Sequence, residues 1–150
     1  MKMPVVGVLV LLVACLKAPP PPAPSQLTVA KPTSEVVQIA SRELAAAGLE
    51  ITNTDAAAGL VVARRARTPS AHGGDVTCRY QKGSIADERA EATLVVTVNA
   101  RPSNTGSDVQ ITSTVRTDRS NLPSPFKAGP NDVDCVSSGS IEKRLADALR

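Results

Sequence analysis

Two segments of the chain alternate between apolar and polar side chains more regularly than any other part, and they constrain its fold most. In residues 93–100 and 109–116, polar residues, mainly Thr, Gln, Asn and Arg, alternate with the aliphatic residues Leu94, Val96, Val98, Ala100, Val109, Ile111 and Val115. Successive residues of a strand point to opposite faces of a sheet, so each segment predicts a strand with one apolar and one polar face. Such strands are typical of an antiparallel sheet that is covered on one side only.

Helices near both ends of the folded part are predicted to provide that cover. Residues 33–47 repeat apolar side chains at helical spacing, and Gly48 ends the segment. Near the C-terminus, Ile141, Leu145 and Leu149 share one face of a helix.

Further strands are predicted at residues 49–54, 60–65 and 75–81. The prediction is an α+β domain, with an antiparallel sheet of four or five strands and an N-terminal and a C-terminal helix packed on one face.

The composition narrows the class of partner. Tyr80 and Phe126 are the only aromatic residues, so the chain lacks side chains on which nucleic-acid bases or sugars could stack. The formal net charge of +3 is not typical of a nucleic-acid-binding protein either. The core must consist of Val, Leu, Ile and Ala. We expect no nucleic-acid binding, and no cofactor motif is present.

The N-terminus has the parts of a secretory signal. Lys2 supplies a positive charge, residues 5–13 form an apolar run, and Ala14 is a small residue at the cleavage position. A bilayer-spanning helix needs about 20 apolar residues, so this run is too short to be one.

Leu12-Val13-Ala14-Cys15 resembles the lipobox of bacterial lipoproteins, the substrates of signal peptidase II. The resemblance implies that residues 1–14 are removed and that Cys15 carries lipid and anchors the chain to a membrane. Leu16 rather than Asp follows the cysteine, which implies the periplasmic side of the outer membrane, with another envelope membrane as the alternative. An ordinary secretory signal with a chance cysteine is the alternative to lipidation.

Residues 15–32 are predicted to be a tether. Residues 18–24 contain five prolines, which favour polyproline II rather than a packed helix or strand. A ligand for a proline-binding domain is the alternative interpretation. The single α+β domain is then expected at residues 33–150.

The other two cysteines, Cys78 and Cys135, are predicted to form a disulfide, because an exported protein meets oxidising conditions. The alternatives are two free thiols or a zinc site with His72, although zinc usually takes four ligands.

Arg64, Arg65 and Arg67 are the candidate anion-binding residues, with Arg79 and Lys82 as neighbours, because guanidinium groups pair well with phosphate or carboxylate. The alternative interpretation is that these arginines lie on an edge strand, where their charge prevents pairing with another chain.

His72 lies between small residues and beside glycines, and we interpret it as a solvated loop residue rather than a catalytic base. Asp132 and Asp134 offer oxygen atoms two residues apart, but the other ligands of a calcium loop are missing, so we expect no metal site.

Residues 35–65 resemble a module in envelope lipoproteins of the outer-membrane barrel-assembly machinery. The residues that carry the resemblance are Leu49-Glu50-Ile51, Asp55 and Gly59-Leu60-Val61. The likeness is one of fold, implies no residue roles, and favours an envelope scaffold.

These patterns together predict a non-enzymatic, lipid-anchored envelope protein. Its sheet face or edge is expected to bind another protein or an anionic envelope component. A periplasmic enzyme or enzyme inhibitor is the alternative, since the sequence contains no catalytic constellation but does not exclude one.

Overall fold

The computed structural model describes residues 23–67, 72–80, 91–118 and 133–150. Seven strands and two helices follow one another in these segments. They are β1 (Ser25–Val29), α1 (Thr33–Ala46), β2 (Glu50–Asp55), β3 (Leu60–Arg67), β4 (Val76–Tyr80), β5 (Glu91–Ser103), β6 (Gly106–Asp118), β7 (Val133–Ser137) and α2 (Ser140–Leu149).

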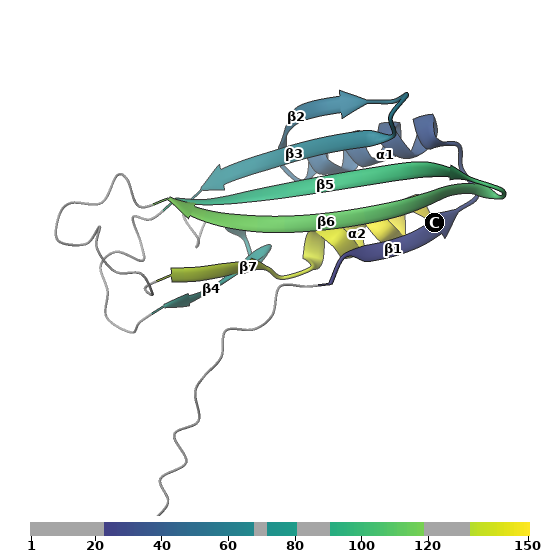
Figure 1. The fold of residues 1–150 in the computed structure, drawn as a ribbon. Helices are drawn as coiled ribbons and strands as arrows, with labels where there is room; N and C mark the ends of the chain where they lie inside the picture. The colour runs from purple at the N-terminus through teal and green to yellow at the C-terminus, as the bar shows by residue number, and fades with distance from the viewer. Residues whose placement is uncertain (1–22, 68–71, 81–90, 119–132) are drawn as a thin grey trace, which may run out of the picture.

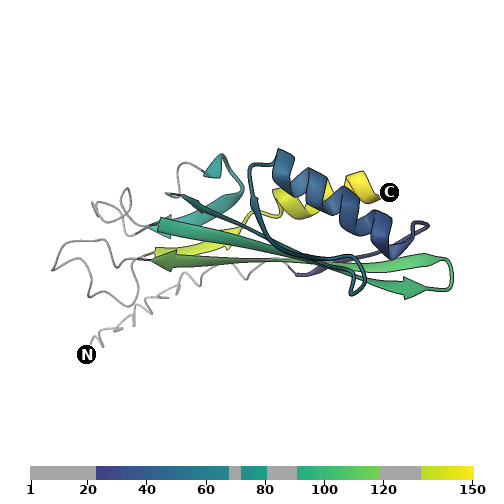
Figure 2. The same ribbon diagram turned by 90° about the horizontal axis from the view of Figure 1, so that it is seen from above.

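Five of the strands form one antiparallel sheet, in the order β1-β6-β5-β3-β2. Both helices lie on the same face of this sheet, as the views from the front and from above show (Figures 1 and 2). The predicted fold class, an antiparallel sheet with an N-terminal and a C-terminal helix on one face, is therefore confirmed.

The core fills the space between the sheet and the helices. Alternate residues of β5 point inward and are fully buried. Helix α1 packs against β5 and β3, and α2 packs against α1, β1 and β6. The predicted helix residues Ile141, Leu145 and Leu149 are all buried. Burial of such aliphatic side chains contributes roughly 1.5–3 kcal/mol each, so the two amphipathic helices gain most of their stability from this face.

Strand β1 lies inside the segment that was predicted to be a tether, so the tether prediction is wrong at its C-terminal end. Residues 25–29 pair in antiparallel register with β6, and Val29 is buried. Apolar Leu27 and Val29 alternate with polar Gln26 and Thr28, which is a strand pattern too short to stand out beside the prolines. The ordered domain thus includes residues before 33.

Two glycines permit close approaches that the fold needs. Gly106, directly after the turn between β5 and β6, has φ +144° and lies against the backbone of Val29. Gly59 has φ +70° and lies against the carbonyl of Ala100. Any side chain at these positions would meet neighbouring backbone, and the positive φ values favour glycine in addition.

Strands β4 and β7 form a separate two-stranded antiparallel sheet (Figure 1). Cys78 and Cys135 stand directly opposite each other in it and are joined by a disulfide, as predicted. The disulfide therefore joins β4 to β7. Cys135 belongs to β7, which precedes α2 by two residues.

Candidate functional site

The face of the large sheet opposite the helices is the candidate site, and we call it the open face. No other described element covers it, as the view from above shows (Figure 2). Its side chains come from the outward positions of β1, β6, β5 and β3, and all are exposed or half-buried. They are Gln26, Thr28, Leu60, Val62, Arg64, Ala66, Glu91, Thr93, Val95, Thr97, Asn99, Arg101, Asp108, Gln110, Thr112, Thr114 and Arg116.

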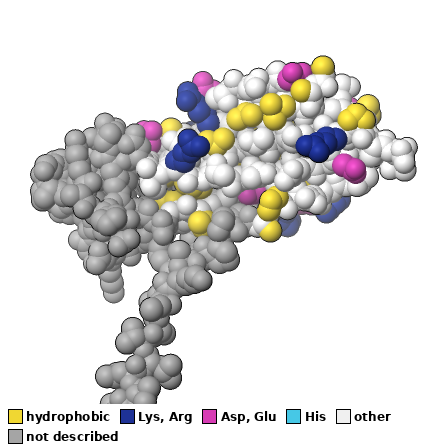
Figure 3. Space-filling model, in the orientation of Figure 1, with side chains coloured by type: hydrophobic (Ala, Val, Ile, Leu, Met, Phe, Trp, Pro, Cys, Tyr) yellow, Lys and Arg dark blue, Asp and Glu magenta, His cyan; other side chains and the backbone are white. Residues whose placement is uncertain are grey.

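The middle of the open face is uncharged. Thr97 and Thr112 stand opposite each other on β5 and β6, and Val62 is the neighbour of Thr97 on β3. In the space-filling view, most dark blue and magenta side chains of this face lie toward its two ends, with white and yellow between them (Figure 3). A mixed polar and apolar centre with charge at the margin resembles the surface of a protein interface.

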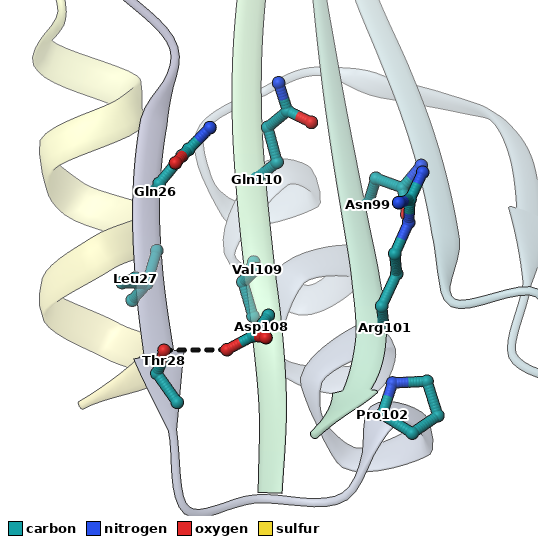
Figure 4. A pocket seen from close by; sticks show the side chains of 9 residues that line it. All are labelled: Gln26, Leu27, Thr28, Asn99, Arg101, Pro102, Asp108, Val109 and Gln110. Carbon is teal, nitrogen blue, oxygen red and sulfur yellow. Dashed lines mark hydrogen bonds between the residues drawn. The ribbon is translucent and has the colours of Figure 1, made fainter. Parts of the chain in front are cut away.

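A shallow hollow of about 540 Å³ lies where β1, β6 and β5 carry their outward side chains. Carboxamides of Gln26, Gln110 and Asn99 form a row across the three strands in register (Figure 4). In the next row, Thr28 donates a hydrogen bond to Asp108 (2.7 Å). The hollow therefore offers both donors and acceptors to a polar ligand.

The three candidate arginines do not form one surface cluster. Arg64 points to the open face, where it pairs with Glu50 at 3.2 Å; both side chains are largely exposed. Arg67 is exposed at the end of β3, beside Gly48. Arg65 is buried on the helix side of the sheet, with 8% of its surface exposed.

Arg65 is engaged inside the protein rather than available to an anion. Its guanidinium donates to the Ala47 carbonyl (2.8 Å), the His72 carbonyl (3.3 Å) and the Asp75 carboxylate (2.5 Å). It is therefore not part of an anion-binding surface. The alternative interpretation, protection of an edge strand, does not hold for Arg64, because β3 lies between β5 and β2 at that position. Beyond Arg64, residues 65–67 have register partners on β5 only.

His72 is a buried residue, so its interpretation as a solvated loop histidine is wrong. Its side chain is 1% exposed and its Nε2 lies 2.8 Å from the Ala92 carbonyl oxygen. A carbonyl only accepts, so Nε2 is the donor in this hydrogen bond. The glycines that follow His72 in the sequence suggested an exposed loop. Its contact with β5 instead places the side chain in the interior.

Asp75 connects three parts of the fold. It accepts from Arg65 of β3 and from the Ser140 hydroxyl at the start of α2 (2.5 Å), and its backbone carbonyl accepts from the amide of Ser138 (3.0 Å). Burial raises the pKa of the Asp75 carboxyl, but the hydrogen bonds from Arg65 and Ser140 and the charges of Arg65 and Arg144 outweigh burial and hold the pKa below its ordinary value of 3.8. The perturbed acid is thus committed to internal contacts.

Several predicted residues lie outside the described part of the chain. Cys15, Lys82 and Asp132 fall in segments that the structure does not describe, and the side chains of Arg79 and Asp134 are likewise not described.

Sequence reasoning missed two residues of the open face, Gln26 and Thr28, because it assigned them to the tether. The signal that could have found them is the alternation of residues 25–29, which matches the polar and apolar faces of the neighbouring strand β6.

The fold and site define an α+β domain with both helices on one face of the sheet and a polar opposite face that no other described element covers. No protein-family model matches the chain, and no curated protein sequence matches it either. Among the described helices, none is both long enough and apolar enough to cross a membrane.

Proposed function

We propose that this chain is a non-enzymatic, lipid-anchored envelope protein whose open face binds another protein. The observation that carries the proposal is that both helices lie on one face of the sheet, which leaves a surface of Thr, Val and carboxamide side chains uncovered. Exposed aliphatic groups such as Leu60, Val62 and Val95 among polar neighbours gain free energy when a partner removes them from water.

A protein suits this face better than an anionic polymer. Arg65 is buried and paired, and Arg64 already has Glu50 as a partner. The remaining arginines on the face, Arg101 and Arg116, are far apart along it, and Asp108 lies beside the first. A polyanion needs a concentration of positive charge, which this arrangement does not supply.

Two buried or perturbed groups support a binding role over a catalytic one. His72 lies under β5 with its Nε2 committed to a backbone carbonyl, and Asp75 is held by Arg65 and Ser140. A general base must reach the proton of a substrate, so neither group is placed for that task.

The anchor is proposed from the sequence. Leu12-Val13-Ala14-Cys15 supplies a lipobox-like site for acylation, and Leu16 after it favours the outer membrane, with the domain facing the periplasm. The proline-rich residues 18–24 would separate the domain from the lipid surface as a stiff spacer.

Cys15→Ser should abolish anchoring, because a serine hydroxyl does not replace the acylated thiol. We expect the variant to remain uncut or to be released in soluble form, while the wild type partitions into detergent. Phase partitioning with a nonionic detergent, after mass analysis of the N-terminus, measures this. A processed Cys15→Ser protein that partitions like the wild type would refute the anchor.

The binding proposal is tested by photo-crosslinking in native membranes. A photoreactive residue replaces Gln110 on the open face or, as the matched control, Gln38 on the solvent side of α1; both glutamines are exposed. We expect a discrete protein adduct from position 110 and none from position 38. Equal labelling from both positions, or no adduct from either, would contradict the proposal, and an adduct that contains only a low-molecular-weight ligand would favour an enzyme or inhibitor.

A further inference from the structure

Charge on the outward side of β6 is arranged symmetrically about its middle. Asp108 and Arg116 lie four residues before and four residues after Thr112, and all three point to the open face. At about 3.4 Å per residue, the two opposite charges are roughly 27 Å apart along one strand. Both charged side chains are exposed, whereas Thr112 is half-buried.

The arrangement on β5 has the same centre. Thr97 is the register partner of Thr112, so one row of the sheet contains both residues. Arg101 lies four residues beyond Thr97 toward the hairpin, and Glu91 lies near the opposite end of the same face. Each strand therefore carries a positive charge at one end, a negative charge at the other, and uncharged side chains between them.

We infer that the open face binds the open face of a second copy of this chain, with a two-fold axis that crosses the strands at the row of Thr97 and Thr112. This inference rests on the proposed function, of which it names the partner. Rotation about that axis brings Asp108 of each copy over Arg116 of the other and directs Arg101 toward Glu91. A two-fold interface uses the same patch on both copies and must be complementary to itself, which is the property this charge pattern has.

The uncharged middle suits close contact between two sheets. Sheets pack face to face about 10 Å apart when the side chains between them are of moderate size and interdigitate. Thr97, Thr112, Thr114, Val95 and Val62 are small or β-branched. The charged neighbour in the row of Val95 and Thr114 is Arg64 on β3, whose charge is paired with Glu50. The resulting dimer has four layers, with the two sheets inside and the helices of each copy outside.

The size of the face is also adequate. Strands β5 and β6 have 13 residues each. Strands β1, β2 and β3 are shorter, with five, six and eight residues. At about 3.4 Å per residue and about 4.8 Å between strands, the five strands offer roughly 700 Å² per copy, close to the about 800 Å² per partner that stable complexes bury.

A charge-swap series on the full chain, purified in detergent, tests the inference. Asp108→Arg and Arg116→Asp each place like charges opposite one another, and we expect each to raise the dimer dissociation constant at least about tenfold. The double variant Asp108→Arg with Arg116→Asp exchanges the charges, and we expect it to return the constant to within about threefold of wild type. Arg42→Asp, on the exposed side of α1, is the control with the same charge change as Arg116→Asp and should have no effect. Sedimentation equilibrium measures the constants.

Crosslinking at the axis is a second measurement that does not depend on charge. Thr112→Cys places one thiol of each copy beside the other, so a short bis-maleimide should link two chains, whereas Gln38→Cys should not. A wild-type chain that stays monomeric, or a double swap as weak as the single variants, would overturn the inference. If position 110 crosslinks a different protein in membranes while the chain is monomeric, the second-copy inference fails and the proposed function stands; if no open-face adduct forms at all, both fail.

Discussion

Replacing Arg65 with methionine should lower the free energy of unfolding by about 3–5 kcal/mol, the usual cost of leaving one member of a buried ion pair alone. The side chain is 8% exposed and its partner Asp75 is 20% exposed. Methionine fills a similar volume but donates no hydrogen bond, so the Asp75 carboxylate and the carbonyls of Ala47 and His72 lose a donor.

The neighbouring residue on the same strand supplies a matched control. Arg64→Met removes an ion pair with Glu50 in which the side chains are 57% and 68% exposed. Exposed pairs contribute about 0.2–1 kcal/mol, so this variant should remain close to wild type. Urea unfolding followed by circular dichroism measures both. If the two variants were equally stable, Arg65 would not be the buried link between the sheet and the segment before β4.

Asp75 makes part of this stability depend on pH. Its pKa is below 3.8 in the folded protein, so its contribution is fully present above its unfolded pKa and is lost as the pH falls through the lower, folded pKa. Wild type should therefore lose stability below about pH 4, and Asp75→Asn should be less stable at neutral pH and show a shallower loss on acidification. Unfolding free energies measured from pH 2 to 7 give this slope; identical slopes for the two proteins would contradict the assignment.

Removing the disulfide should cost about 4 kcal/mol in the loop-entropy model, because the bridge closes a segment of 57 residues. It should also loosen the register of β4 against β7, which have only five residues each. The double variant Cys78→Ala with Cys135→Ala tests this by urea unfolding. It avoids a leftover thiol, which a single replacement would leave.

Reduction of the wild type provides the control for packing. Wild type unfolded with reductant should match the double variant to within about 1 kcal/mol, because both lack the loop constraint. A double variant as stable as the oxidised wild type would show that the bridge adds nothing to the small sheet.

The sequence predicts the parts of this fold in which local pattern and final environment agree. Residues 93–100 and 109–116 alternate with few exceptions because one side of each strand packs against helices and the other side is exposed to solvent. They form the inner strands β5 and β6. Ile141, Leu145 and Leu149 repeat at helical spacing for the same reason. The disulfide was predictable from the number of cysteines and from an N-terminus that has the pattern of a secretory signal.

Other features depend on contacts that no local pattern contains. The sequence pattern indicates a surface position for Arg65. In the fold, its guanidinium is buried by contacts with Ala47 at the end of α1, His72 and Asp75. His72 follows a small residue and precedes glycines, yet the carbonyl of Ala92, 20 residues away, holds it in the interior. Strands β1 and β7, with five residues each, are too short for alternation alone to identify them beside prolines or before a helix.

The candidate site was predictable in outline only. Placing both helices on the apolar side predicts a free polar face, but its membership depends on strand order. Gln26 lies in one row with Gln110 and Asn99 because β1 pairs with β6, which is distant from it in the sequence. For example, 80 residues separate the register partners Thr28 and Asp108. Likewise, the symmetry of charge about Thr112 has meaning only once β5 and β6 are in register.

The most direct measurement of an occupied open face is thiol labelling in intact envelopes. Gln110→Cys and Gln38→Cys are introduced separately, and the rate of maleimide modification is compared in native membranes and in purified, dilute, detergent-solubilised protein. We expect position 110 to be protected at least about tenfold in membranes and to become as reactive as position 38 on dilution, since an interface excludes water and reagent from its centre. Equal rates at both positions in native membranes would contradict a binding role for this face.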